Sequence, residues 1–179
     1  GDGAWDLGVY QPANGAWYAR SLAGRLLVAG AIWGGPGLRA VPGDYDGDRL
    51  SDFGVYDAHS GGWYIQSVAG PILAWNLPLG APGFEPVPGD FDGDRALDPA
   101  VYYGAPGYWY ARRADGTVLL WAELWGSPEM TPVSGDYDGD GVWDLAVYHE
   151  ASGLWYVRAS VGGQALLWAA PWGGPGLAP

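Results

Sequence analysis

The stretch GDYDGDGVWDLAVY, residues 135–148, decides how this chain folds. It occurs twice more, as GDYDGDRLSDFGVY from Gly43 and as GDFDGDRALDPAVY from Gly89, and its second half opens the chain as GDGAWDLGVY. The three full copies start 46 residues apart. Self-similarity at a fixed period of this length indicates a repeat architecture, so the chain is a tandem array of one structural unit.

The rest of each period repeats as well. A G-x-W-Y motif recurs at Gly15, Gly61, Gly107 and Gly153, and each copy is followed by an apolar stretch and a Gly/Pro turn such as GGPG. One extra residue near Gly162 is the only shift of register. We therefore divide the 179 residues, taken as a single domain, into repeats 1–42, 43–88, 89–134 and 135–179, and we expect the first to lack its start and the last its end.

Glycine and proline set the expected secondary structure. The 32 glycines and 15 prolines leave no segment long enough for three helical turns. We expect four strands per repeat: one entering the acidic phrase, one leaving it, one after the next turn, and one before the Gly/Pro turn. Four antiparallel strands in tandem repeats are typical of β-propeller blades, so the predicted fold class is an all-β propeller.

Composition excludes several partners. The chain carries 20 acidic residues against eight arginines and no lysine, a formal charge of −12, so nucleic acid is not an expected partner. No apolar run approaches the length of a membrane span, so membrane insertion is not expected either. Without cysteine, disulfides cannot stabilise the fold.

The acidic residues are concentrated in the repeated phrase, which holds 14 of the 20. Each full copy reads Asp-x-Asp-Gly-Asp-x-x-x-Asp, with carboxylates at loop positions 1, 3, 5 and 9 and glycine at position 4. Calcium takes six to eight oxygen ligands, which alternating short carboxylates on a wrapped chain can supply. A glycine permits the positive φ of such a wrap. The loop is not an EF-hand, because its twelfth position is Val55, Val101 or Val147 and not glutamate.

This pattern predicts three complete Ca²⁺ sites and one partial site. Backbone carbonyls at position 7 are expected to add to the carboxylates, and the first repeat keeps only positions 5 and 9. The predicted ligands are Asp44, Asp46, Asp48, Leu50 and Asp52; Asp90, Asp92, Asp94, Ala96 and Asp98; Asp136, Asp138, Asp140, Val142 and Asp144; and, in the partial site, Asp2 and Asp6.

The phrase GDYDGDG-x-x-D-x-x-VY, followed by G-x-W-Y and W-G-x-P-G, resembles the FG-GAP/VCBS-type repeats of bacterial surface and secreted proteins, which are related to the calcium-loop blades of integrin α-subunit propellers. The resemblance covers essentially the whole chain. It implies calcium ligation in a hairpin between the first two strands of a blade, and an extracellular or cell-surface location. It names no ligand, since such propellers serve adhesion, glycan binding and scaffolding.

Aromatic residues recur in register and have two interpretations. As core, they would fill the wedge between blades; this group includes Trp17, Trp63, Trp109 and Trp155, and then Trp75, Trp121 and Trp168. As a binding surface, rings beside the turns would stack on sugar faces; these are Trp33, Trp125 and Trp172. Trp5 and Trp143, at position 8 of the acidic loop, are expected to be exposed and are candidate ligand-binding residues too.

No catalytic residue is predicted. His59 and His149 lie at non-equivalent repeat positions, and the chain has no cysteine, no lysine and no G-x-S-x-G turn. We expect a non-catalytic calcium-binding module for adhesion or for binding a glycan or protein ligand.

The alternative is a structural unit that self-associates through its incomplete first repeat and builds an extracellular filament or stalk by strand donation. Closure also stays open between a four-bladed ring, an eight-bladed ring of two chains, and such a filament.

Overall fold

The structure, a computed structural model, describes residues 6–179, which form fifteen strands and no helix. The strands lie in four separate antiparallel sheets that follow one another along the chain. The prediction of an all-β fold is therefore confirmed. Among the residues described, no helix could cross a membrane.

Each sheet is a meander whose strands pair in chain order. The first sheet contains β1 (Leu7–Gln11), β2 (Ala16–Arg20) and β3 (Leu26–Ile32). The second contains β4 (Leu38–Ala40), β5 (Phe53–Asp57), β6 (Gly62–Gln66) and β7 (Ile72–Pro78). The third contains β8 (Phe84–Pro86), β9 (Ala100–Tyr103), β10 (Tyr108–Arg112) and β11 (Val118–Leu124). The fourth contains β12 (Met130–Pro132), β13 (Leu145–His149), β14 (Leu154–Arg158) and β15 (Ala165–Pro171).

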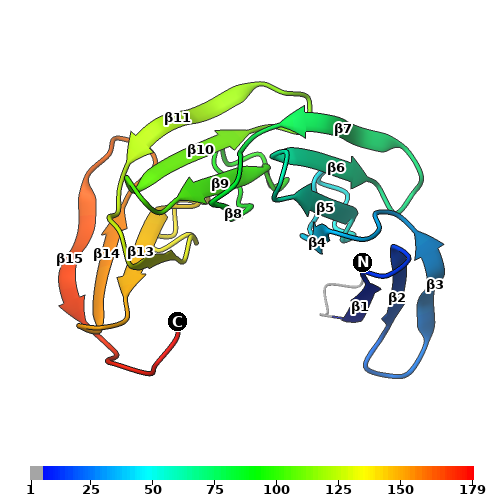
Figure 1. Ribbon diagram of the computed structural model, residues 1–179, viewed down its shortest axis with the longest axis horizontal. Helices are drawn as coiled ribbons and strands as arrows, with labels where there is room; N and C mark the ends of the chain where they lie inside the picture. Colours follow the sequence, from blue (N-terminus) through cyan, green and yellow to red (C-terminus); the bar gives the residue numbers. More distant parts are fainter. Residues whose placement is uncertain (1–5) are drawn as a thin grey trace.

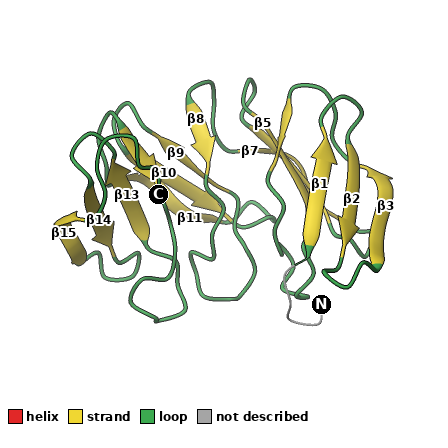
Figure 2. Ribbon diagram, turned by 90° about the horizontal axis from the view of Figure 1, so that it is seen from below, coloured by secondary structure: helices red, strands yellow, loops and turns green. Residues whose placement is uncertain are grey.

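The four sheets stand along an open arc, with the first and the last sheet at its two ends (Figure 1). The three-residue strands β4 and β8 lie on the inner side of the arc, and the seven-residue strands β3, β7, β11 and β15 lie on its outer side. Seen from below, the strands run between two rims where the connections gather (Figure 2). The acidic loops join the inner strand of a sheet to the strand beside it.

Four strands per repeat are found in the second, third and fourth sheets, as the sequence predicts. The hydrogen-bonded unit, however, begins at Leu38, Phe84 or Met130, five residues before the glycine that opens each predicted repeat. A sequence period fixes the length of a repeat but not its phase. Hydrogen bonding assigns each short strand to the sheet that follows it.

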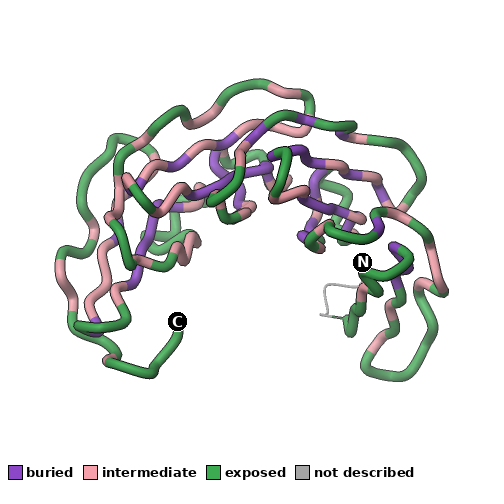
Figure 3. Tube along the Cα trace, viewed as in Figure 1, coloured by how far each residue is buried: buried purple, intermediate pink, exposed green. Residues whose placement is uncertain are grey.

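The core lies between neighbouring sheets. Tyr56, Trp63 and Ile65 of the second sheet are fully buried and pack in one cluster with Val101 of the third sheet. A second cluster joins the third and fourth sheets in the same way. Figure 3 shows the buried residues mainly along the middle strands of the sheets, such as β5, β6, β9 and β10, and mostly exposed or half-buried residues along the outer strands. Each sheet therefore depends on its neighbours to bury its apolar face.

The tryptophans that recur at one position of the repeat lie in the core as expected, whereas those that recur on the outer strands do not. Trp63 and Trp109 are fully buried and Trp17 is nearly so, and the indole N–H of Trp63 donates to the Leu79 carbonyl oxygen (3.1 Å). Trp155 is half-buried. On the outer strands the core interpretation is wrong, since the exposed fractions are 68%, 57% and 71% for Trp75, Trp121 and Trp168.

An irregularity in the strand pairing accompanies this exposure. The register of β6 and β7 shifts between Trp63 and Tyr64, and Asn76 beside Trp75 has a φ of 53°. The outer strands of the other three sheets show the same shift. Bulges of this kind twist a strand and redirect its side chains, so the outer strand presents Trp75 to solvent.

Gly61 marks a close approach between two backbone segments and yields a stability prediction. Its φ is 77°, and a Cβ placed there would lie 2.1 Å from the Gly80 carbonyl oxygen. Gly24 is the matched control, because its φ is 84° and its Cβ would meet nothing within 4 Å. Gly24→Ala should cost about 1–2 kcal/mol of unfolding free energy for the left-handed backbone alone. Gly61→Ala should cost about 1–3 kcal/mol more, because the backbone must shift.

Urea unfolding of the two variants measures this difference. Equal losses for Gly24→Ala and Gly61→Ala would contradict the close approach.

Candidate metal-binding loops and aromatic pocket

The acidic loops run from residue 44 to 52, from 90 to 98 and from 136 to 144, and each is closed by an isolated bridge between the preceding glycine and the last aspartate. In every loop, three carboxylates each place an oxygen within 4.8 Å of the other two. The groups are Asp44, Asp46 and Asp48; Asp90, Asp92 and Asp94; and Asp136, Asp138 and Asp144. The structure therefore brings together nine of the predicted aspartates.

Backbone conformation explains how the loop turns so tightly. Gly47, Gly93 and Gly139 at position 4 have φ values of 77°, 78° and 80°, as predicted. Position 6 is also left-handed, and there the residues are Arg49 (φ 70°), Arg95 (φ 73°) and Gly141 (φ 90°). The sequence analysis missed this second turn residue, although the glycine of the third copy was a signal for it.

The first aspartate organises its loop through both carboxylate oxygens. Oδ1 of Asp44 accepts the N–H of Gly47 and Oδ2 accepts the N–H of Arg49, both at 2.7 Å. Asp90 and Asp136 make the same pair of bonds. A carboxylate offers about four lone-pair positions, so these bonds orient the group and leave capacity for a cation.

The ninth position is buried in all three loops. Oδ2 of Asp52 accepts the N–H of Tyr45 (2.8 Å), and Oδ1 accepts the N–H of Val68 (3.2 Å). Burial raises the pKa of Asp52 to about 6 and that of Asp98 to about 7, and the neighbouring aspartates add to the rise. The pKa of Asp144 is raised for the same reasons. A cation near these carboxylates would relieve the unfavourable negative charge.

The donor set of these loops fits a hard divalent cation. The clustered side-chain donors are all carboxylate oxygens, which is the chemistry that calcium prefers. The position-7 residues Leu50, Ala96 and Val142 donate their N–H to the aspartate at position 5 of their loop, and ligation by their carbonyls stays a prediction. Asp6 is exposed, and the predicted Asp2 and Trp5 lie outside the described residues.

The second loop differs from the others because an arginine enters it. Arg113, just after β10, forms ion pairs with Asp92 (2.5 Å) and Asp94 (3.6 Å). The Asp92 carboxylate raises the pKa of the Arg113 guanidinium. Ser67 and Ala159 take this position in the second and fourth sheets. The second loop thus already holds a positive charge of its own.

Successive loops contact each other through position 8. The N–H of Leu97 donates to the Asp44 carbonyl oxygen, and the N–H of Trp143 donates to that of Asp90, both at 2.6 Å. The Trp143 ring packs over Gly89. Trp143 is half-buried and joins the core cluster between the third and fourth sheets, so the expectation of an exposed ring there was wrong. The space between two loops needs a bulky side chain.

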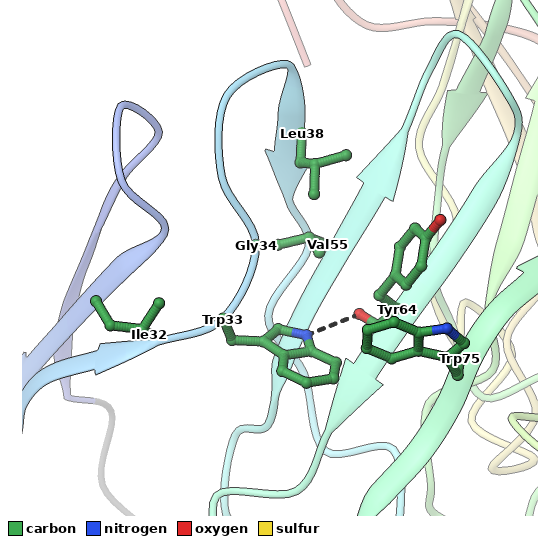
Figure 4. Close-up of a pocket in the computed structure, with 7 residues that line it drawn as sticks. All are labelled: Ile32, Trp33, Gly34, Leu38, Val55, Tyr64 and Trp75. Carbon is green, nitrogen blue, oxygen red and sulfur yellow. Dashed lines mark hydrogen bonds between the residues drawn. The ribbon is translucent and has the colours of Figure 1, made fainter.

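An aromatic pocket opens between the first and second sheets (Figure 4). Its volume is about 250 Å³, and its lining includes Trp33, Tyr64 and Trp75. The Trp33 indole N–H donates to the Tyr64 carbonyl oxygen (3.2 Å), and the Trp33 and Trp75 rings meet edge to face with centroids 5.8 Å apart. Trp125 and Trp168 form the same pair between the third and fourth sheets.

The predicted aromatic candidates therefore divide into two kinds. Trp33 and Trp125 are half-buried and hold neighbouring sheets together. Trp172 is 82% exposed. Among the outer-strand rings, Trp75 lines the pocket and Trp168 packs on Trp125 between the third and fourth sheets. The sequence analysis missed both rings because it placed them in the core.

Comparison with known proteins adds no assignment, because no family model, no curated protein and no solved structure matches this chain.

Arg113 generates a prediction about the second loop. Replacing it with serine, the residue at this position in the second sheet, should strengthen Ca²⁺ binding at the second loop severalfold, because the ion no longer competes with the guanidinium. Arg39→Ser is the matched control, since it removes one positive charge that pairs with Glu85 and not with a loop.

Isothermal titration calorimetry with calcium measures the effect. Site affinities that change equally in the two variants would contradict a local role for Arg113.

Proposed function

We propose that this chain is a non-catalytic, calcium-binding β-propeller segment of a secreted or cell-surface protein, and that it binds a carbohydrate ligand. The observation that carries the proposal is the recurrence of one loop geometry three times. Each loop gathers three carboxylates within 4.8 Å and turns at a glycine with a φ near 80°. Three acidic loops that share this turn are most readily explained by a divalent ion.

The arrangement of the sheets supports the β-propeller interpretation. Four-stranded antiparallel meanders stand in succession along an arc, with their short strands on the inner side. Propeller blades have this organisation, and each blade packs against the next. The resemblance of the acidic phrase to FG-GAP/VCBS-type repeats supports the same proposal.

Calcium suits the site better than magnesium does. Magnesium demands near-ideal octahedral geometry, whereas calcium accepts an irregular set of carboxylates, carbonyls and waters. Three bound ions would change the formal charge from −12 to −6. Loops of this type fill at the calcium concentrations found outside cells, which favours a secreted or surface-exposed protein.

The aromatic pocket favours a sugar as the ligand. Trp75 is 68% exposed, and the Trp33 and Tyr64 rings each meet its ring edge to face. An exposed indole ring matches the apolar face of a pyranose. The pair formed by Trp125 and Trp168 supplies a second site, so weak single contacts would add by avidity.

Calcium removal tests the metal proposal. At a calcium concentration of 100 times Kd, each site contributes about 2.7 kcal/mol, because the ion binds only the folded loop. A change of 1 kcal/mol shifts the Tm of a chain of this size by about 2–4 °C. A chelator should therefore lower the Tm by more than about 10 °C, as measured by circular dichroism.

The matched variants are Asp136→Asn and Asp57→Asn. The first changes a clustered loop carboxylate and should reduce the chelator effect. The second makes the same chemical change in a turn outside the acidic loops, so the chelator should lower its Tm by the full amount. A Tm that the chelator leaves unchanged in the unaltered protein would contradict calcium binding.

Trp75→Ala tests the ligand proposal. We expect a glycan array to retain the protein, and we expect Trp75→Ala to weaken binding of the selected sugar about tenfold. Trp121→Ala is the matched control, because the residue corresponding to Trp33 in the second sheet is Leu79, so Trp121 is in no tryptophan pair. Fluorescence titration measures both affinities. Absence of binding to every glycan on the array would contradict a carbohydrate ligand.

A further inference from the structure

Two junctions between neighbouring sheets carry the same group of three aromatic rings. The first aromatic site, between the first and second sheets, consists of Trp33, Tyr64 and Trp75, and the second aromatic site, between the third and fourth sheets, consists of Trp125, Tyr156 and Trp168. In each site the outer-strand tryptophan meets the tyrosine ring edge to face, with centroids 5.4 Å apart. That tryptophan is 68% exposed in the first site and 71% in the second. A sugar would therefore meet the same stacking ring at either site.

A charged pair distinguishes the second aromatic site. Nη2 of Arg158, in the fourth sheet, donates to Oε2 of Glu123, in the third sheet (2.8 Å). The guanidinium carbon of Arg158 also lies 5.7 Å from the centroid of the Trp125 ring. Because Arg158 contacts both residues, the Glu123 carboxylate lies at the edge of the aromatic site.

Glu123 is the member of this pair that a ligand can reach. The side chain of Arg158 is 19% exposed, whereas that of Glu123 is 45% exposed. The ion pair uses Oε2 of Glu123, and Oε1 accepts no hydrogen bond within residues 6–179. A carboxylate offers about four lone-pair positions, and hydrogen bonds to an ionised acceptor are stronger than neutral ones. Glu123 can therefore accept a hydroxyl group of a sugar that stacks on Trp168.

The first aromatic site lacks such a pair. The counterparts of Glu123 and Arg158 at the first junction are Ala31 and Gln66. The pocket beside Trp75 is lined by aromatic and aliphatic residues such as Ile32 and Leu38, and by no carboxylate or cationic side chain. The two sites thus share their rings and differ in charge.

The junction between the second and third sheets shows that the charged pair is not a general feature of the repeat. Leu77 takes the place of Glu123 there, and Arg112 takes that of Arg158. The guanidinium of Arg112 lies over Trp121 of its own sheet, 5.2 Å from the ring centroid. An arginine at this position of the repeat forms an ion pair across the junction where a glutamate faces it.

We propose that Glu123 determines which sugars the second aromatic site accepts. A neutral pyranose stacks on Trp168 and donates a hydroxyl group to Glu123. A uronic acid is rejected, because its carboxylate would meet that of Glu123, and like charges in contact are strongly unfavourable. Arg158 is a positioning residue that holds the carboxylate in place. The inference rests on the proposed function, since it takes sugar binding at the rings as given and adds the class of sugar.

NMR titration of the calcium-loaded protein tests the proposal at each site separately. The probes are the methyl glycosides of glucose, galactose and mannose and the matched methyl uronides. The indole N–H signals of Trp75 and Trp168 are assigned by their loss in Trp75→Phe and Trp168→Phe. In about 0.15 M salt, which screens the distant acidic loops, we expect the Trp168 site to prefer the neutral glycoside about tenfold or more over its uronide. The Trp75 site should bind both within about threefold of each other.

Glu123→Gln should remove the preference at Trp168 and leave the titration of Trp75 unchanged. Glu85→Gln is the matched control, because Glu85 is an exposed carboxylate that pairs with Arg39 and belongs to neither site. The double variant Ala31→Glu with Gln66→Arg installs the charged pair at the first junction. We expect it to give the Trp75 site a preference of about tenfold for the neutral glycoside.

The outcomes separate this inference from the proposed function. Equal affinity of the Trp168 site for neutral and acidic sugars, or a preference that persists in Glu123→Gln, would overturn the role of Glu123 while sugar binding stands. Shifts of the Trp75 signal alone would also overturn it. If no probe shifts either indole signal, the inference is wrong together with the carbohydrate proposal.

Discussion

Packing of each sheet against the next is the interaction on which the rest of the structure depends. No sheet can bury its apolar face alone, and the fully buried residues Tyr56, Trp63 and Val101 lie where two sheets meet. Stability is therefore distributed along the chain from neighbour to neighbour. The same side chains that are core in the interior sheets become exposed surface in the end sheets, as Val9 shows.

The acidic loops are held in place by this packing. Their aspartates accept backbone N–H groups of their own loop, and at the ninth position Asp52 and Asp144 also bond to the turn between the third and fourth strands of their sheet. Position 8 links the second and the third loop to the loop before it. The concentrated negative charge is thus fixed on a continuous backbone scaffold and cannot spread apart to reduce repulsion. That constraint is what makes a cation the natural partner of the loops.

Periodicity in the sequence was sufficient to predict the strands, the loops and the turn glycines. Gly47 illustrates why: only one residue type takes that conformation freely, so its recurrence specifies the backbone. Whether a recurring side chain is buried or exposed was harder to predict. Trp75 and Trp63 recur equally well, yet one is exposed and one is buried, because a bulge between them redirects the outer strand. Trp143 was misjudged because contact between loops far apart in sequence leaves no local pattern.

The ion pair of Arg113 has a consequence for how the loops act together. The arginine lies outside the acidic phrase, in a turn that carries Ser67 in the sheet before it. If the loops bind calcium as proposed, substitution in that turn should change how strongly a loop attracts the ion without altering any of the loop's aspartates. In an array whose residue at this turn varies from repeat to repeat, the loops would bind calcium one after another as the calcium concentration rises. The protein would then respond gradually across a range of calcium concentrations and not at one threshold.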